Sequence, residues 1–171
     1  SDGYIQVWRD LPQLAMTPAQ FNQNINIEGG NPFAGSGELD GNGIPATFFQ
    51  DVHVRRAFSY CFDYEAMIAD ALNGEGIQSQ GPIIAGMLGY REGEAPLYSY
   101  DPVKCEEEFK LAEGDVWETG FYFQMAYNTG NDTRRLASEI LKAGIEAVND
   151  KFSITVVGMP WPVLLNARRA G

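Results

Sequence analysis

The sequence predicts an α/β fold, because the spacing of its apolar residues changes twice in the second half of the chain. In residues 120–127, GFYFQMAY, strongly apolar side chains alternate with less apolar ones, and this period of two is typical of a strand. Residues 131–149 carry apolar side chains at helical spacing, and residues 151–157 return to alternation. A strand, a helix and a strand in succession predict a βαβ unit with two parallel strands.

The helix of this unit is expected to begin at Asn131 or Asp132, because either side chain can accept a hydrogen bond from a backbone N–H of the first turn. A last helix is predicted from residues 160–162, PWP, since proline fits the first turn of a helix. The buried face of the first of these helices is expected to consist of Leu136, Ile140, Ala143 and Ala147, flanked by Ala137, Gly144 and Val148.

Residues 51–76, DVHVRRAFSYCFDYEAMIADALNGEG, predict a pair of helices. Asp51 and Asp63 are the expected N-caps, and Asn73 with Gly74 supplies the left-handed backbone that ends the second helix. One apolar stripe runs along the first helix, so another element must cover it. Its residues are Val54, Ala57, Phe58 and Cys61.

A further helix is predicted after Asp101, because proline follows it at the first helical position. Cys105 and Phe109 share a face of this helix with Ala112. Cys105 and Cys61 thus each lie on the apolar side of a helix, where a free thiol behaves as a small hydrophobe, and we expect both to be unbridged. A disulfide between them is the alternative, since an oxidising compartment would permit it if their Cα atoms lay within about 7 Å.

The N-terminal part of the chain is expected to be less regular. Residues 4–9 and 21–27 have the composition of short strands. Residues 28–45, EGGNPFAGSGELDGNGIP, are rich in glycine and predict a long surface loop. Acidic and amide side chains alternate within this loop, but it lacks the glycine and the closing glutamate of a calcium loop, so no metal site is predicted there.

Composition and charge restrict the class of protein. With 171 residues, 44% hydrophobic and 20% charged, the chain is expected to form a single domain, residues 1–171, with a core of its own. A formal net charge of −11 repels the phosphates of nucleic acids, so that class of partner is excluded. No apolar run approaches the ~20 residues of a membrane-spanning helix.

Few residues suit a catalytic site. The single histidine, His53, lies roughly 12 Å along a helix from Cys61, too far to activate it as a nucleophile. A small hydrolase that pairs His53 with a cysteine brought close by the fold stays an alternative. The acidic run at residues 106–108 is expected to be a solvated surface. One histidine and two separated cysteines do not predict a zinc site, and no cofactor is predicted.

The turn that joins the predicted strand to the predicted helix is the candidate binding site. Ligands of α/β proteins collect at the carboxyl ends of parallel strands, and the free N–H groups of a helix start can bind a carbonyl or an anion. Uncharged amide and hydroxyl groups in this turn suit a neutral or carbonyl group. The residues expected to touch a ligand are Tyr127, Asn128, Thr129, Gly130 and Asn131.

Three stretches of the chain are informative when they are taken together and in order. They are residues 43–82, GIPATFFQDVHVRRAFSYCFDYEAMIADALNGEGIQSQGP, residues 98–114, YSYDPVKCEEEFKLAEG, and residues 127–149, YNTGNDTRRLASEILKAGIEAVN. In this order they resemble the extracellular solute-binding proteins of family 5, which serve oligopeptide and dipeptide ABC importers, and the first stretch is the most informative. Residues 2–12 and 151–171 extend the resemblance to nearly the whole chain.

This resemblance implies a lobe like that of the type II periplasmic-binding proteins, with a parallel βαβ unit and additional helices. The chain would be most of the second lobe of a two-lobe receptor that captures an oligopeptide, a dipeptide or a similar small solute and delivers it to ABC permease subunits in the membrane. The implied location is extracytoplasmic, in the periplasm or at the cell surface, where a lipid anchor can hold the full-length protein. Besides the small hydrolase, the other alternative to the solute-binding function is a partner-binding module without catalysis.

The sequence departs from the dipeptide receptors in the candidate turn. The matching loop of those receptors contacts the terminal carboxylate of the ligand partly through an arginine, but residues 127–129 of this chain contain none. Arg134 and Arg135 lie a turn inside the helix, where they are expected to cover surface or to pair with Glu139.

Overall fold

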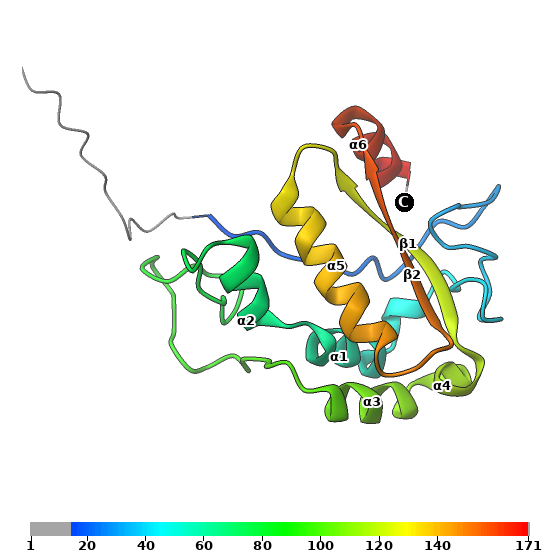
Figure 1. Ribbon diagram of the computed structural model, residues 1–171, viewed down its shortest axis with the longest axis horizontal. Coiled ribbons are helices and arrows are strands. Elements are labelled where there is room, and N and C mark those ends of the chain that lie inside the picture. Colours follow the sequence, from blue (N-terminus) through cyan, green and yellow to red (C-terminus); the bar gives the residue numbers. More distant parts are fainter. Residues whose placement is uncertain (1–14, 171) are drawn as a thin grey trace, which may run out of the picture.

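The computed structural model describes residues 15–170. Eight helices and strands follow one another in these residues, with short 3-10 or π turns between some of them (Figure 1). The predicted strand at residues 4–9 lies outside the described part of the chain. The elements are α1 (Val52–Cys61), α2 (Tyr64–Ala66), α3 (Pro102–Leu111), α4 (Val116–Thr119), β1 (Phe121–Asn128), α5 (Asp132–Glu146), β2 (Phe152–Met159) and α6 (Trp161–Ala170).

The predicted βαβ unit is confirmed. β1 and β2 pair in parallel, in a register that runs from Phe121 opposite Phe152 to Asn128 opposite Met159. α5 connects them, and Asn131 caps it by accepting a hydrogen bond from the backbone N–H of Arg134. Because the strands are parallel, their carboxyl ends lie together, at the upper end of the sheet in Figure 1, next to the start of α5 and α6.

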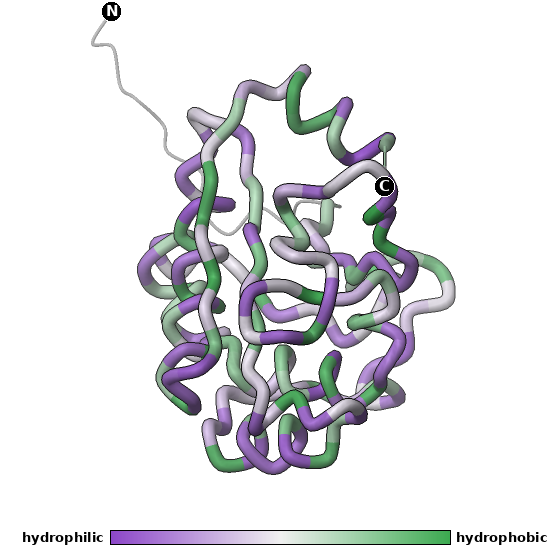
Figure 2. The backbone as a smooth tube through the Cα atoms, turned by 90° about the vertical axis from the view of Figure 1, so that its right-hand side faces the viewer, coloured by the Kyte–Doolittle hydropathy of each residue, from purple (hydrophilic) through white to green (hydrophobic). Residues whose placement is uncertain are grey.

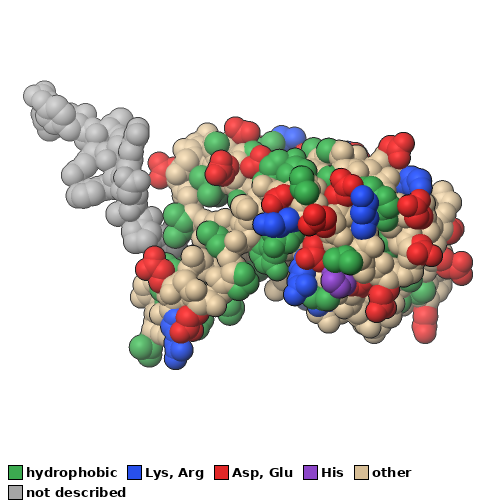
Figure 3. All heavy atoms as spheres, turned by 90° about the horizontal axis from the view of Figure 1, so that it is seen from below, with side chains coloured by type: hydrophobic (Ala, Val, Ile, Leu, Met, Phe, Trp, Pro, Cys, Tyr) green, Lys and Arg blue, Asp and Glu red, His purple; other side chains and the backbone are tan. Residues whose placement is uncertain are grey.

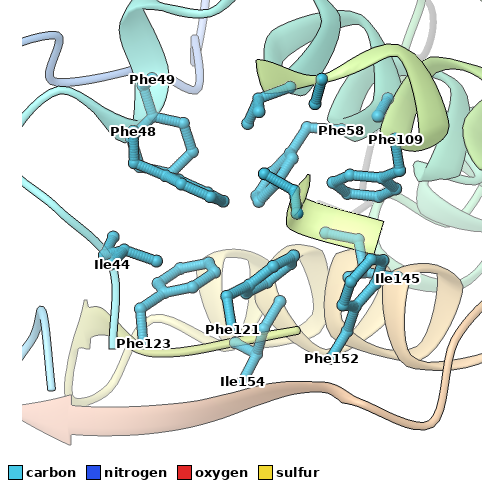
Figure 4. Close-up of a cluster of buried hydrophobic side chains, with 14 of the residues drawn as sticks. Ile44, Phe48, Phe49, Phe58, Phe109, Phe121, Phe123, Ile145, Phe152 and Ile154 are labelled. Carbon is cyan, nitrogen blue, oxygen red and sulfur yellow. The ribbon is translucent and has the colours of Figure 1, made fainter. Parts of the chain in front are cut away.

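An aromatic core lies on one face of this two-stranded sheet. Phe121 is fully buried, and its ring centroid lies 4.4 Å from that of Phe152 on the neighbouring strand. Phe58 of α1 and Phe109 of α3 approach the same ring from the helices, with centroids 6.3 Å and 5.8 Å away (Figure 4). The core therefore unites both strands with α1 and α3, as the apolar stripes of those helices predict.

α1 and α3 are joined by a disulfide, so the prediction of two unbridged thiols is wrong. Cys61 and Cys105 are bonded, with their Cα atoms 5.4 Å apart, and both side chains are fully buried. The apolar stripes correctly placed each cysteine in the core. The helix pairing that brings the two stripes face to face depends on contacts distant in sequence, and this pairing decides that a bond can form.

α5 packs against the C-terminal end of α1 through a glycine. Gly144 is buried, and a Cβ atom at this position would overlap the Cys61 carbonyl oxygen. The prediction for the buried face of α5 is therefore partly wrong. Ala143 and Ala147 are exposed, and the buried face lies about one residue further along the helix. The observed face consists of Ser138, Gly144 and Ile145, with Leu141 and Val148 partly buried.

Replacing Gly144 by alanine is expected to destabilise the chain by about 1–3 kcal/mol, because the new methyl group must displace backbone at Cys61. Ordinary helix propensity predicts the opposite sign, since alanine in a helix interior is favoured over glycine by about 1 kcal/mol. The exposed neighbour gives the matched control: Ala143→Gly should cost only the propensity difference. Urea unfolding of both variants measures the two effects, and a stabilised Gly144→Ala variant would contradict the close packing.

The segment before α1 is irregular, and the predicted strand at residues 21–27 is wrong. These residues lack a strand partner along their length; a single backbone hydrogen bond joins the Ile25 N–H to the Ala46 carbonyl. Their apolar side chains Phe21, Ile25 and Ile27 nevertheless pack on the core, which explains why the segment has the composition of a strand. Residues 28–45 contain one isolated bridge, between Gly35 and Gly43, and they bury Ala34 and Ile44.

The second predicted helix is present in modified form. Asp63 caps α2, but after one turn the backbone widens into a π-helical segment, Met67–Ala71. Asn73 and Gly74 then adopt the left-handed conformation that their residue types predict, with φ of 51° and 80°. In Figure 2, hydrophobic and hydrophilic segments are interspersed along the coloured part of the tube. No helix in residues 15–170 is long and apolar enough to cross a membrane.

Candidate functional site

The candidate binding turn lies where β1 ends and α5 begins. Asn128 is the last residue of β1 and lies opposite Met159, the last residue of β2, so the turn stands at the carboxyl edge of both strands. Thr129 and Gly130 are exposed, whereas Tyr127, Asn128 and Asn131 are half-buried. The structure thus brings together all five residues that the sequence predicts for the site.

The backbone of this turn offers fewer free donors than the sequence suggests. The Thr129 N–H donates to the Met159 carbonyl over 2.9 Å, and the Asn131 N–H donates to the Asn128 carbonyl over 3.2 Å. The Asn131 side-chain oxygen is engaged as the cap of α5. A ligand would therefore meet mainly the amide NH₂ groups of the two asparagines and the Thr129 hydroxyl.

Tyr127 packs across the neighbouring strand because that strand has a glycine at the paired position. Gly158 lies opposite Tyr127 in the register, and a Cβ atom there would come within 2.9 Å of the Tyr127 hydroxyl. The Thr129 side chain approaches the same point. Gly158 therefore leaves room for the Tyr127 ring, which orients this side chain at the rim of the turn.

Arg134 also reaches the turn, which the sequence did not predict. Its Nη1 atom donates a hydrogen bond to the Asn128 side-chain oxygen over 2.8 Å. Its guanidinium carbon lies 5.8 Å from the ring centroid of Trp161, the first residue of α6. The predicted pairing with Glu139 is not found within the described chain, where Arg135 instead pairs with Asp132 at 3.4 Å.

Two hollows in the surface lie away from this turn. The first, of about 360 Å³, is lined by Lys110, Ala112, Asp115, Trp117 and Glu118 near the end of α3. The second, of about 230 Å³, lies between α5 and the start of α2 and includes Cys61 and Gly144. Neither hollow includes residues 127–131. The turn itself is exposed or half-buried, so it is an open wall that needs an opposing surface to enclose a ligand.

The hydrolase alternative loses its nucleophile in this structure, because both cysteine sulfurs are bonded to each other. The Nδ1 atom of His53 instead lies within hydrogen-bond distance, 2.7 Å, of the Glu108 carboxylate on α3, and Figure 3 shows the histidine on the surface among acidic and basic side chains. Glu108 is thus not a freely solvated residue of the acidic run. Within residues 15–170, no three His, Cys, Asp or Glu side chains are grouped to hold a metal ion.

The parallel βαβ unit with its added helices has the fold of the type II periplasmic-binding proteins. The oligopeptide-binding protein AppA from Bacillus subtilis, solved with a nonapeptide, matches with a TM-score of 0.60 at 20% identity. The match covers 69% of this chain and 25% of AppA. The sequence profile of "Bacterial extracellular solute-binding proteins, family 5 Middle" matches residues 2–171. The chain belongs to this family.

Two curated relatives match shorter stretches. The Probable D,D-dipeptide-binding periplasmic protein DdpA of Escherichia coli is 41% identical over 56 residues, which are 33% of this chain and 11% of that protein. Heme-binding protein A of Haemophilus influenzae is 30% identical over 98 residues, which are 56% of this chain and 17% of that protein. The chain therefore spans less than a fifth of the length of either relative.

Proposed function

We propose that this chain is part of one lobe of a two-lobe receptor, the substrate-binding component of an ABC importer. The receptor would capture a peptide or a related small solute between its lobes and deliver it to permease subunits in the membrane. Its location would be extracytoplasmic. The family match over residues 2–171 carries this proposal, because members of the family are extracellular solute-binding proteins rather than enzymes.

The open turn at residues 127–131 would supply part of the ligand-binding wall. Its exposed and half-buried amide groups can hydrogen-bond the backbone of a peptide without selecting particular side chains. The opposing lobe would complete the enclosure, since a ligand pocket normally buries most of the ligand surface. Hinge closure of the two lobes would bring that second wall into place.

Calorimetry on the full-length receptor tests this function directly. A library of short peptides should contain members that bind with a dissociation constant in the micromolar range or below, as expected for a receptor that scavenges solutes. The buried disulfide favours an oxidising compartment, so the receptor should be prepared in its oxidised form. A receptor that binds no peptide but hydrolyses an ester or amide substrate would overturn the proposal.

Replacing Asn128 and Asn131 together by alanine should weaken solute binding by roughly 1–3 kcal/mol, because ligand groups lose partners in a desolvated cleft. Asn131→Ala should also lower the free energy of unfolding by up to ~1 kcal/mol, since it removes the cap of α5. Calorimetric affinity in the full-length receptor and urea unfolding separate the two effects.

The matched control is Asn149→Ala at the opposite, amino end of the sheet. This variant removes a side-chain hydrogen bond of 2.8 Å to the Trp117 carbonyl and should change stability while leaving affinity intact. Unchanged affinity in the double variant at Asn128 and Asn131 would mean that the turn is only a connection.

A further inference from the structure

The disulfide between Cys61 and Cys105 is buried, but its two ends have different surroundings. The described residues that line the hollow of about 230 Å³ between α5 and the start of α2 include Cys61 but not Cys105. Cys105 and Phe109 are the buried residues of α3, and the Phe109 ring packs in the core against the rings of Phe58 and Phe152. The hollow therefore lies at the Cys61 end of the bond, and the aromatic core lies at the other end.

The wall of this hollow on the α2 side is weakly held. Asp63 and Ala66 belong to this wall, and α2 is a single turn without a buried side chain. The π-helical segment that follows α2 and residues 72–100 also contribute no residue to the buried core. Segments with few buried apolar contacts open at a low cost in free energy. An outward movement of α2 would therefore uncover Cys61 and leave the core around Cys105 closed.

The opposite wall of the hollow belongs to α5 and consists mainly of small side chains. Ile140, Ala143 and Gly144 line it, and the Gly144 carbonyl oxygen lies 3.4 Å from Cys61 Sγ. α1 packs against both α5 and α3, and Figure 1 shows it between these two helices. The hollow thus leads to Cys61 from the α5 side, and α3 holds Cys105 on the other side of α1.

The helix ends favour the same direction of attack on the bond. Cys61 is the last residue of α1, whereas Cys105 is the fourth residue of α3. The positive end of a helix dipole is the N-terminus, so a thiolate is stabilised at Cys105 and disfavoured at Cys61. In thiol–disulfide exchange the sulfur that forms the more stable thiolate leaves faster. Cys105 is therefore the better leaving group, and Cys61 is the sulfur that is both attacked more readily and reached more easily.

We propose that the hollow between α5 and α2 is a thiol–disulfide exchange site, at which a small thiol attacks Sγ of Cys61. The thiolate sulfur forms a bond to Cys61 Sγ while the bond between the two cysteines breaks. The electron pair of the broken bond leaves with Cys105 Sγ, which takes a proton from water. The incoming sulfur is thereby oxidised and Cys105 is reduced, so no further oxidant or reductant is needed. This inference does not depend on the proposed solute-binding function.

The test follows which cysteine the incoming thiol joins. The oxidised full-length protein is mixed with reduced glutathione for short times under native conditions and quenched with acid. Alkylation of the free thiols and peptide mass spectrometry then locate the glutathione. Early in the reaction, glutathione on Cys61 with an alkylated Cys105 should exceed the reverse arrangement by about 10-fold or more, because access and leaving group act in the same direction.

Two alanine positions on α5 test the route through the hollow. Ala143→Leu places a larger side chain in the hollow and should slow the exchange by roughly 10-fold, because the thiol loses its access to Cys61. Ala147→Leu is the matched control, since the same side chain is added one turn further along α5, outside the described residues that line the hollow. Both alanines are exposed, so neither substitution crowds the core. The exchange rate in Ala147→Leu should equal that of the unmodified protein.

The variant Asp63→Ala tests the mobile wall. It removes the cap of α2, a hydrogen bond of 2.9 Å that the Asp63 side chain accepts from the Ala66 N–H, and should speed up the exchange. The preference for Cys61 should persist, because the core around Cys105 stays closed. Urea unfolding of each variant measures its global stability and separates this local opening from complete unfolding.

The remaining outcomes contradict the proposal. Equal amounts of glutathione on both cysteines, or equal exchange rates in Ala143→Leu and Ala147→Leu, would mean that the hollow is not the route to the bond. An exchange rate that follows only the global free energy of unfolding across the variants would place the reaction in the unfolded chain. A protein that forms no mixed disulfide with glutathione under native conditions has no exchange site.

Discussion

Reduction of the disulfide between Cys61 and Cys105 is expected to lower the free energy of unfolding of the chain by about 4 kcal/mol. The bond closes a loop across a sequence separation of 44, and the loss of loop-closure entropy in the unfolded chain gives this magnitude. The loop contains α2, its π-helical continuation and the irregular residues 72–100, which contribute no residue to the buried core. The disulfide therefore constrains a part of the chain that contributes no fully buried side chain of its own.

Urea unfolding with and without reductant measures this effect, and the double variant Cys61→Ala with Cys105→Ala gives the same comparison without reductant. Reduction should be slow under native conditions, because both cysteine side chains are fully buried and the bond must open to solvent first. Loss of one cysteine alone should leave a single free thiol and a similarly destabilised chain. Equal urea midpoints for the oxidised and reduced chains would show that the bond does not restrain the unfolded state.

Local signals predicted the βαβ unit and most helix ends. The change of apolar period marks β1, α5 and β2, and each period depends only on residues close in sequence. The caps are equally local: Asp51, Asp63, Asp101 and Asn131 all accept the expected backbone N–H groups. At Asp101 this hydrogen bond from Lys104 also holds the pKa of the carboxyl below its ordinary value.

Contacts between distant segments explain what the sequence could not predict. The disulfide requires that α1 and α3 lie side by side, and periodicity shows only that each helix has an apolar stripe. The predicted buried face of α5 was misplaced by about one residue. The reason is that α5 contacts α1 at Gly144, where the backbone of α5 comes close to the Cys61 carbonyl. Such a contact leaves no pattern of hydrophobicity within the helix itself.

At the candidate site, too, the local features could be predicted from the sequence and the contacts between distant segments could not. The sequence correctly placed residues 127–131 at a strand end and a helix start, because these positions follow from local periods. The contact of Arg134 with this turn depends on the conformation of its side chain and on the position of Trp161, which lies on the helix after the next strand. The only sequence signal that could have suggested it is an arginine three residues beyond the cap, with an aromatic residue at the start of the helix that follows the next strand.

Replacing Phe121 by alanine is expected to lower the free energy of unfolding by about 3–5 kcal/mol, the usual cost of removing a buried phenylalanine ring. Phe121 is fully buried between β2 and the helices, in contact with rings from four other segments. The cavity left by its ring is bordered by several other aromatic side chains of the core, which cannot collapse into it without leaving their own contacts.

The matched control for this substitution is Phe62→Ala. Phe62 is half-buried and packs on the ring of Tyr64, with a centroid distance of 4.9 Å, away from the aromatic core. The same atoms are removed, but solvent already reaches the site, so the expected loss is about 1 kcal/mol, near the centre of the range for single substitutions. Urea unfolding of the two variants measures the difference. A similar loss of unfolding free energy in both variants would show that the aromatic core around Phe121, with Phe48, Phe58, Phe109 and Phe152, is not the main source of stability. The contact of α5 with α1 at Gly144 would then be the stronger constraint on the sheet.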